Sequence, residues 1–139
     1  MSSTVPVVYL AHPVGAADAA GVARNLAAAR RWLAVLLELW PEAALVVSWL
    51  PYLDVLEDSG ASRRRGLRDD LAVVRRCDGI ALCGPVVSSG MELELGAALE
   101  VHAFGLNLVG VDIDNRDEIR ERIEELGRLD PRVLGEARP

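Results

Sequence analysis

Short apolar segments alternate with longer segments of helical periodicity along most of the chain, and this alternation limits the possible fold more than any other feature. The short segments have the composition of β-strands and lie at residues 5–11, 44–49, 79–83 and 106–111. The longer segments repeat apolar residues at steps of three and four, as amphipathic helices do, and lie at residues 18–39, 62–76, 91–104 and 115–127. Strands separated by helices pair in parallel through right-handed crossovers. The sequence therefore predicts an α/β fold.

The expected architecture has three layers, in which helices flank a Rossmann-like or flavodoxin-like parallel sheet of four to five strands. The strand at residues 79–83 shows little polar alternation, which is typical of a strand covered on both faces. The length of 139 residues fits one domain over residues 1–139. We expect residues 130–139 to form a loose tail.

Capping and breaking residues set the expected ends of the helices. Asp18 and Asn115 are expected to cap the first and last helices. Pro41 is expected to stop the first helix, and Gly105 to end the third. Residues 51–60 are polar and irregular in pattern, and we expect them to form a loop.

Charge and hydropathy argue against two classes of partner. The net charge of −6 opposes binding to nucleic acid, which depends mainly on excess positive charge. No apolar run reaches the roughly 18 residues that a membrane span needs. The first residues, Met1–Thr4, lack the pattern of a signal peptide, so we expect a cytoplasmic protein. All 15 basic residues are arginine, which excludes lysine chemistry such as Schiff-base formation.

The two cysteines, Cys77 and Cys83, lie on either side of a predicted strand start. Neither has a second cysteine or a histidine at the spacing of zinc ligands. We expect both to be buried, reduced thiols, and we expect no metal site.

In parallel sheets of this kind, ligands bind at the carboxyl ends of the strands, close to the point where the strand order reverses. The loops after Ala11, Trp49, Cys83 and Val111 are therefore the ones expected to form a site. The loop after the third strand contains Ser88–Gly90 and leads into a helix.

Hydroxyl groups and free backbone N–H groups at a helix start attract anions such as phosphate or carboxylate. The alternative is that Ser88 or Ser89 only caps the helix. Glu92 and Glu94 follow in its first turn, and side chains two residues apart point in nearly opposite directions. If one glutamate faces solvent, the other faces the sheet edge. The residues alone leave open which one does.

Asp69 and Asp70 lie on the second helix, where one of them could project toward a pocket. The alternative is a solvated helix face on which the aspartates pair with Arg65, Arg68 or Arg76.

Four further side chains lie near the expected edge, and each has a structural alternative. His12 follows the first strand directly and either contacts a ligand or has a purely structural role. Tyr9 is either a core residue or one whose hydroxyl reaches the pocket. Trp49 and Tyr52 either stack on a flat ligand or cover the core.

Three motifs carry a resemblance to a known family. They are Val8–Pro13 at the end of the first strand, Asp70–Leu71 followed by Asp78, and Ser88–Gly96 with its Ser-x-Gly-x-x-x-Glu-x-Gly spacing. The resemblance extends over residues 5–112. The order and spacing of the motifs resemble those of the nucleoside 2-deoxyribosyltransferase superfamily and its relatives, the nucleoside 5'-monophosphate N-glycosidases.

The resemblance implies that Glu94 is the nucleophile, that Asp70 assists proton transfer and that Tyr9 positions Glu94 or the sugar. It implies contacts with a nucleoside or nucleotide by His12, Pro13, Trp49, Gly84, Ser88, Ser89, Gly90 and Met91. It also implies a homo-oligomer, a dimer or tetramer, and no cofactor. Cleavage of an N-glycosidic bond passes through an oxocarbenium-like state, for which a trapping carboxylate and a second acid are the appropriate groups.

The sequence departs from the family pattern at two places. His12 stands where the family often has glycine, and residues 14–20 contain no arginine that could bind a phosphate. Nucleoside and monophosphate substrates, and hydrolysis and transfer, therefore remain alternatives. A non-catalytic nucleotide-binding or sensing module on the same fold would keep Ser88–Gly90 but would not need Glu94. A purely structural oligomerisation domain is a third interpretation.

Overall fold

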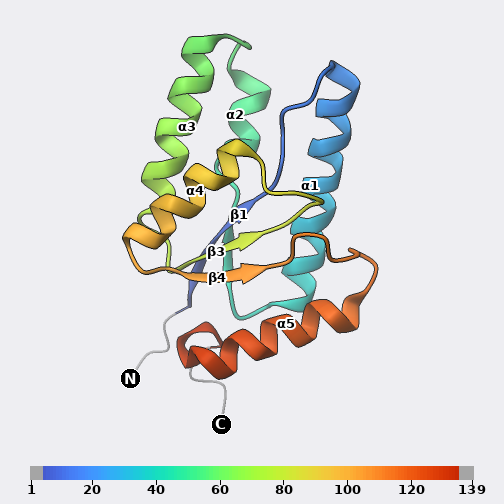
Figure 1. Ribbon diagram of the computed structural model, residues 1–139, viewed down its shortest axis with the longest axis vertical. Coiled ribbons are helices and arrows are strands. Elements are labelled where there is room, and N and C mark those ends of the chain that lie inside the picture. The colour runs from blue at the N-terminus through green and yellow to red at the C-terminus, as the bar shows by residue number, and fades with distance from the viewer. Residues whose placement is uncertain (1–4, 135–139) are drawn as a thin grey trace.

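The computed structural model describes residues 5–134 and has a central sheet of four parallel strands with helices on both sides (Figure 1). The strands are β1 (Val7–Ala11), β2 (Ala44–Val46), β3 (Gly79–Leu82) and β4 (Phe104–Asn107). Their order across the sheet is β2-β1-β3-β4, and every neighbouring pair is parallel. The predicted three-layer, Rossmann-like α/β fold is therefore confirmed.

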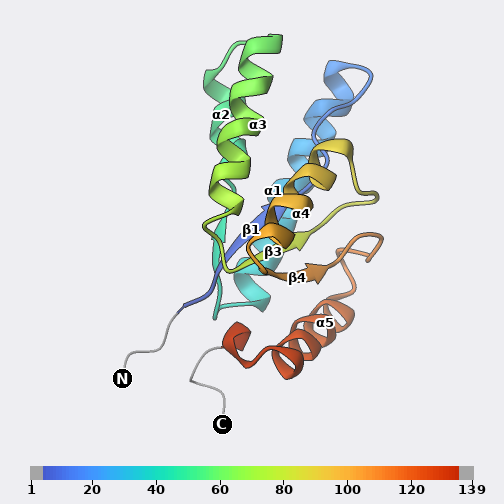
Figure 2. The ribbon, with the colours of Figure 1, turned by 60° about the vertical axis from the view of Figure 1, so that its left-hand side comes forward.

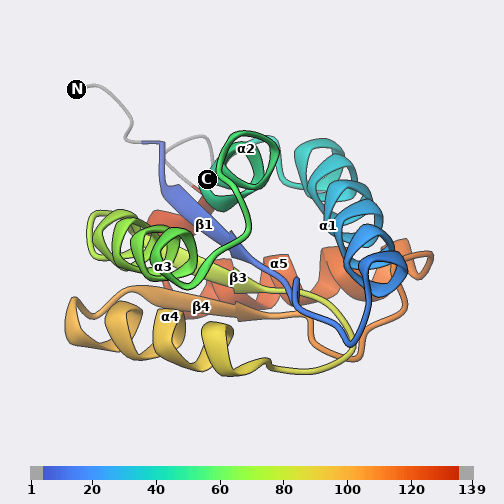
Figure 3. The same cartoon turned by 90° about the horizontal axis from the view of Figure 1, so that it is seen from above.

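The connections between the strands are helical. The helices are α1 (Ala19–Leu39), α2 (Trp49–Val55), α3 (Gly60–Val74), α4 (Ser89–Glu100), α5 (Arg116–Leu129) and the short 3-10 helix η1 (Pro131–Leu134). Seen from above, α1 lies on one side of the strands, and α3 and α4 lie on the other (Figure 3). Two views show α2 beside α3 (Figures 1 and 2).

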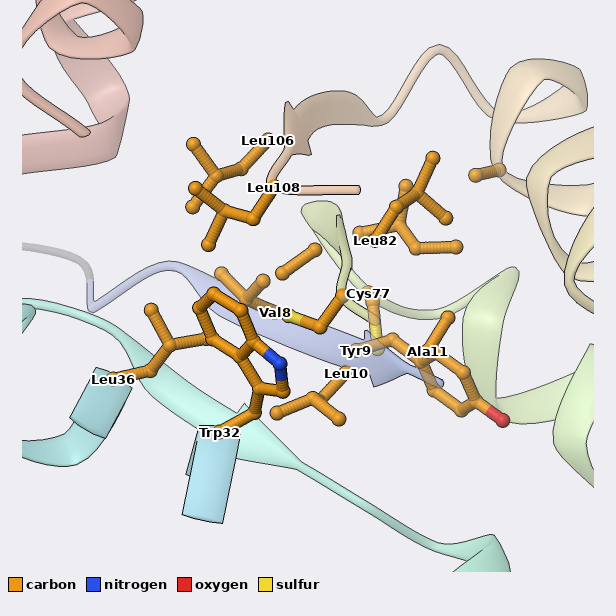
Figure 4. Packing of buried hydrophobic residues seen from close by; sticks show 14 of the residues in the cluster. Val8, Tyr9, Leu10, Ala11, Trp32, Leu36, Cys77, Leu82, Leu106 and Leu108 are labelled. Carbon is orange, nitrogen blue, oxygen red and sulfur yellow. The ribbon is translucent and has the colours of Figure 1, made fainter. Parts of the chain in front are cut away.

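Alternate residues of β1 build the core on both faces of the sheet. Leu10 faces Trp32 and Leu36 of α1, whereas Tyr9 points away from them (Figure 4). Leu10, Tyr9 and Leu36 are each fully buried. Because β1 is a central strand, its side chains reach both helical layers, and Tyr9 is directed toward the layer that holds α3 and α4.

Gly79 allows the closest approach between β3 and β4. A Cβ atom at this position would lie 2.2 Å from Cε1 of Phe104, so no other residue fits without a shift of the ring. The Phe104 ring in turn packs edge-on against Trp40, with 6.2 Å between the ring centroids. The Trp40 indole N–H is buried and has no hydrogen-bond partner within residues 5–134.

The region predicted as a long second strand and a loop is different. β2 ends at Val46, and residues 49–55 form helix α2. Pro51 suggested a loop, but it is the third residue of α2. A proline is tolerated there because the first N–H groups of a helix have no intrahelical acceptor.

The boundaries of α4 and β4 also differ from the prediction. α4 begins at Ser89 and ends at Glu100, and β4 begins at Phe104 instead of Leu106. His102, with φ of 55°, makes the left-handed turn that Gly105 was expected to make. Gly105 is consequently a strand residue.

Two predicted N-caps are confirmed, because Asp18 accepts from Gly21 N and Asn115 accepts from Glu118 N. α3 begins earlier than predicted and is capped by Ser59. The prediction of a loose tail is wrong for residues 131–134, which form η1 and bury Val133 and Leu134, while residues 135–139 lie outside the described residues.

Cys77 and Cys83 are free and buried, as predicted. Burial raises the pKa of the Cys77 thiol to about 11 and raises that of Cys83 further still. Between residues 5 and 134, no helix is both long and apolar enough to cross a membrane.

Candidate functional site

All four strands end at one edge of the sheet, and hydrogen bonds hold the loops of this carboxyl edge together. Gly110 N donates to the Gly84 carbonyl at 2.9 Å, which joins the loops after β4 and β3. The Asn25 amide donates to the carbonyls of Val14 at 2.9 Å and Gly15 at 3.2 Å. Asn25 thereby fixes the loop after β1. Asn25 was not predicted as a site residue, although a polar residue at a half-buried position of an amphipathic helix is a signal for such a role.

Of the two glutamates near the start of α4, Glu92 and Glu94, Glu94 is the buried one. Its side chain is 7% exposed, whereas Glu92 is exposed. The Tyr9 hydroxyl donates a hydrogen bond to Oε2 of Glu94. The structure thus brings together two predicted site residues that come from a central strand and from the helix after β3.

Asp70 is the second buried acid of this region and is 9% exposed. The hydroxyl of Ser48 donates to its Oδ1 at 3.2 Å. Ser48 lies just before α2, on the connection from β2, and it was not predicted as a site residue because residues 44–49 were assigned to a strand. A hydroxyl at the carboxyl end of an apolar run is the signal that pointed to it.

Burial and neighbouring carboxylates raise the pKa values of these groups. Burial, with a smaller contribution from the charge of Asp70, raises the pKa of Glu94 to about 7, although the Tyr9 hydrogen bond opposes the shift. Burial, with a contribution from Asp69, raises the pKa of Asp70 to about 6 against the effect of Ser48. Burial and both carboxylates raise the pKa of Tyr9 far above its usual range, so the phenol stays protonated. Tyr9, Glu94 and Asp70 therefore form one electrostatically coupled set, here called the carboxyl cluster.

Asp69, next to Asp70 in the sequence, pairs with an arginine of α3, which was the alternative considered for both aspartates. It accepts a hydrogen bond from Tyr52 at 2.8 Å and pairs with Arg68 at 2.9 Å. The hydrogen bond from Tyr52 is the main cause of its lowered pKa. Tyr52 is thus tied to α3.

His12, Pro13 and Gly84 form a second group at the carboxyl edge. All three are buried. The His12 Nδ1 atom lies 2.8 Å from the Pro13 carbonyl oxygen. A Cβ atom on Gly84 would lie 2.8 Å from Cδ of Pro13, so the loop after β3 packs directly on the loop after β1.

At the start of α4, Ser88 caps the helix, which was one of the two alternatives for the serines of this loop. Ser88 is the N-cap and accepts from Met91 N at 3.3 Å, and Met91 is buried. Ser89 is exposed, and Gly90 is half-buried. The hydroxyl of Ser88 is therefore used within the chain, while the predicted ligand contacts of Ser88–Met91 stay predictions.

Trp49 belongs to the core. Its side chain is 7% exposed, and its indole N–H donates to the Leu10 carbonyl at 3.0 Å. This bond anchors the start of α2 to β1, directly beside Tyr9.

A groove of about 400 Å³ lies elsewhere, between β4 and α5. It is lined by Gly105, Leu106, Asn107, Glu118, Glu121, Arg122, Glu125, Leu126 and Leu129, none of which is a predicted site residue. Arg122 crosses it and donates to the Asn107 carbonyl at 2.8 Å. In the part of the chain that the structure describes, no group of three or more histidine, cysteine or acidic residues could hold a metal ion.

Replacing Tyr9 with phenylalanine is expected to destabilise the protein by about 1–3 kcal/mol above pH 7, because the buried Glu94 carboxylate loses the donor that Tyr9 provides. Urea unfolding followed at about pH 8 measures this change. Tyr52→Phe, which removes the partly buried hydrogen bond to Asp69, is the control and should have a clearly smaller effect on the free energy of unfolding. Equal effects of the two variants would contradict a special role for the Tyr9–Glu94 contact.

Comparison with known families gives one match. Residues 6–103 match the model of a family described as Domain of unknown function (DUF7768). The matched segment runs from β1 through α4 and includes Tyr9, Asp70 and Glu94. No curated protein matches the chain. The chain therefore belongs to the family described as a domain of unknown function, DUF7768.

Proposed function

We propose that the protein cleaves or transfers across the N-glycosidic bond of a nucleoside or nucleotide, with Glu94 as the nucleophile and Asp70 as the acid and base. The observation that carries this proposal is the carboxyl cluster. It holds two buried acids, and the charge of Asp70 contributes to the raised pKa of Glu94, which accepts a hydrogen bond from a buried tyrosine. Glu94 lies in the helix that follows the carboxyl end of β3, and ligands commonly bind at this edge of a parallel sheet.

In the first step, a carboxylate oxygen of Glu94 bonds to the anomeric carbon of the sugar while the bond from that carbon to the base nitrogen breaks. The electron pair of the broken bond goes to the base, and the proton of Asp70 neutralises it. Tyr9, held protonated, donates to Glu94 and keeps the attacking oxygen in place. The developing positive charge on the sugar offsets the unfavourable burial of the Glu94 charge.

In the second step, ionised Asp70 removes a proton from water or from an acceptor base, which attacks the same carbon. The bond to Glu94 breaks, and its electron pair returns to the carboxylate. Water gives hydrolysis, and a second base gives transfer. The same two groups therefore support both outcomes, with Asp70 first an acid and then a base.

These roles require ionised Glu94 and protonated Asp70, which predicts a bell-shaped dependence of activity on pH. The ionised fraction of Glu94 rises as pH increases through about 7, and the protonated fraction of Asp70 falls as pH increases through about 6. Their product is largest between these two values. The active form has Glu94 ionised while Asp70 is still protonated. Because Glu94 has the higher pKa of the two, only a minority of the free enzyme is in this form at any pH.

The test is release of free base from a panel of ribonucleosides, deoxyribonucleosides and their 5'-monophosphates, with kcat/KM followed from about pH 4.5 to 9. We expect at least one substrate to lose its base, with an optimum between pH 6 and 7. Binding of nucleosides or nucleotides without release of base from any of them would overturn the enzyme and favour a binding or sensing module.

We further propose that the protein is a homo-oligomer that acts in the cytoplasm. The exposed face of α4 supports self-association, because Leu93 and Leu99 are 51% and 65% exposed there. Light scattering measures the oligomeric state.

A further inference from the structure

The Nε2 atom of His12 is buried and has no hydrogen-bond partner among residues 5–134. The whole His12 side chain is 5% exposed. Most buried polar atoms in proteins are paired, because an unpaired one loses its hydrogen bonds to water without replacement. This atom therefore needs a specific explanation, and it lies at the ligand edge of the sheet, directly after β1.

The other ring nitrogen determines what Nε2 can bind. Nδ1 lies 2.8 Å from the Pro13 carbonyl oxygen, which only accepts hydrogen bonds, so Nδ1 carries a proton. Burial lowers the pKa of His12, which keeps the ring neutral at pH 7. Nε2 then holds a lone pair and is an acceptor only.

The loop after β3 packs closely on the His12 ring and covers Nε2. Gly84 has φ of +104°, and a Cβ atom there would lie 3.1 Å from Nε2. Gly84 begins the loop that leads to the start of α4. Val86 and Val87 in this loop are 57% and 40% exposed, so the loop is weakly packed. A modest shift of this loop would uncover Nε2.

We propose that His12 Nε2 recognises an N–H or O–H group of the ligand and so selects nucleosides that carry a donor at that point. The inference rests on the proposed function. The acceptor is already dehydrated in the free protein, so a donor on the ligand gains the hydrogen bond without the usual loss of water from Nε2. An analogue without that donor leaves Nε2 unpaired. We expect a preference of roughly 10- to 100-fold.

The donor is either an amino group of the base or a hydroxyl of the sugar, and matched ligands distinguish them. Adenosine and purine riboside differ by the amino group, as do cytidine and pyrimidin-2-one riboside. Adenosine and its 2'- and 3'-deoxy forms differ by one hydroxyl. Dissociation constants are measured by calorimetry with the wild type and with Glu94→Gln, in which the ligand stays intact.

We expect one pair to show the preference in the parent protein and His12→Phe to reduce it to nearly one. His12→Gln, whose amide oxygen accepts, should retain part of the preference. Trp40→Phe removes the other buried unpaired atom, far along the chain from His12, and should retain all of it.

Equal preference in the parent and in His12→Phe would overturn this inference, while nucleoside binding itself would leave the proposed function standing. If no nucleoside binds to the wild type or to Glu94→Gln, both fall. If His12→Phe does not fold, His12→Leu provides the same comparison, because it also lacks an acceptor.

Discussion

Glu94→Gln is expected to abolish base release and, in the same protein, to increase stability above pH 7. An amide oxygen does not form the ester with the sugar carbon, so kcat should fall by at least about 1,000-fold. The glutamine still accepts a hydrogen bond from Tyr9, which keeps the packing of α4 on β1. The loss of activity would therefore not reflect a disordered site.

The gain in stability follows from the raised pKa of Glu94. Its value goes from 4.5 to about 7 on folding, so the folded state prefers the protonated carboxyl. This preference is fully present below pH 4.5 and is lost as pH rises through about 7. Above that pH the buried charge destabilises the wild type by about 3 kcal/mol, which Glu94→Gln removes. Urea unfolding of both proteins at about pH 4.5 and pH 8 measures the difference, which should appear only at the higher pH.

Glu92→Gln is the matched control, since Glu92 lies in the same turn and is exposed. It should retain both the activity and the pH dependence of stability shown by the wild type. Base release by Glu94→Gln at the wild-type rate would remove Glu94 from the mechanism. A stability difference that does not change with pH would show that Glu94 is ordinarily solvated.

Asp70→Asn is expected to lower base release by about 100- to 10,000-fold for bases that must be protonated as they leave. Asparagine has the same shape and still accepts from Ser48, but it has no proton to give at the pH of the reaction. A base that leaves as a neutral molecule without protonation needs no acid. The ratio of guanosine to 7-methylguanosine cleavage measures this dependence, and Asp70→Asn should lose much less activity on 7-methylguanosine.

Asp69→Asn is the control for this variant. Asp69 is the adjacent residue, but it is bonded to Tyr52 and Arg68 at the surface. We expect Asp69→Asn to cleave both substrates nearly as fast as the wild type. An equal loss on both substrates by Asp70→Asn would assign Asp70 to positioning of the sugar and not to proton transfer.

The parallel α/β architecture was predictable because β1 and β3 are short apolar segments separated by long periodic helices. The exact ends of the helices and strands depend on tertiary contacts, which the spacing of apolar residues along the sequence does not show. His102 takes the left-handed conformation after α4, and Phe104, two residues later, begins β4 and packs on Trp40. α2 was missed because it has only seven residues, one of them Pro51.

The candidate site was predictable in part. Burial of Glu94 instead of Glu92 agrees with the spacing Gly90–Glu94–Gly96, which came from family resemblance and not from helix geometry alone. The polar side chains of Ser48 and Asn25 were only a weak signal, because each acts through hydrogen bonds to another segment of the chain. The sequence near each residue does not show which segment that is.

The separation of Tyr9 and Glu94 along the chain has a consequence for folding. They are 85 residues apart, on β1 and α4, so their contact requires that α4 is docked on the sheet. In any intermediate without docked α4, Glu94 is hydrated and titrates as an ordinary carboxyl. Docking of α4 is then coupled to uptake of a proton by Glu94 near neutral pH.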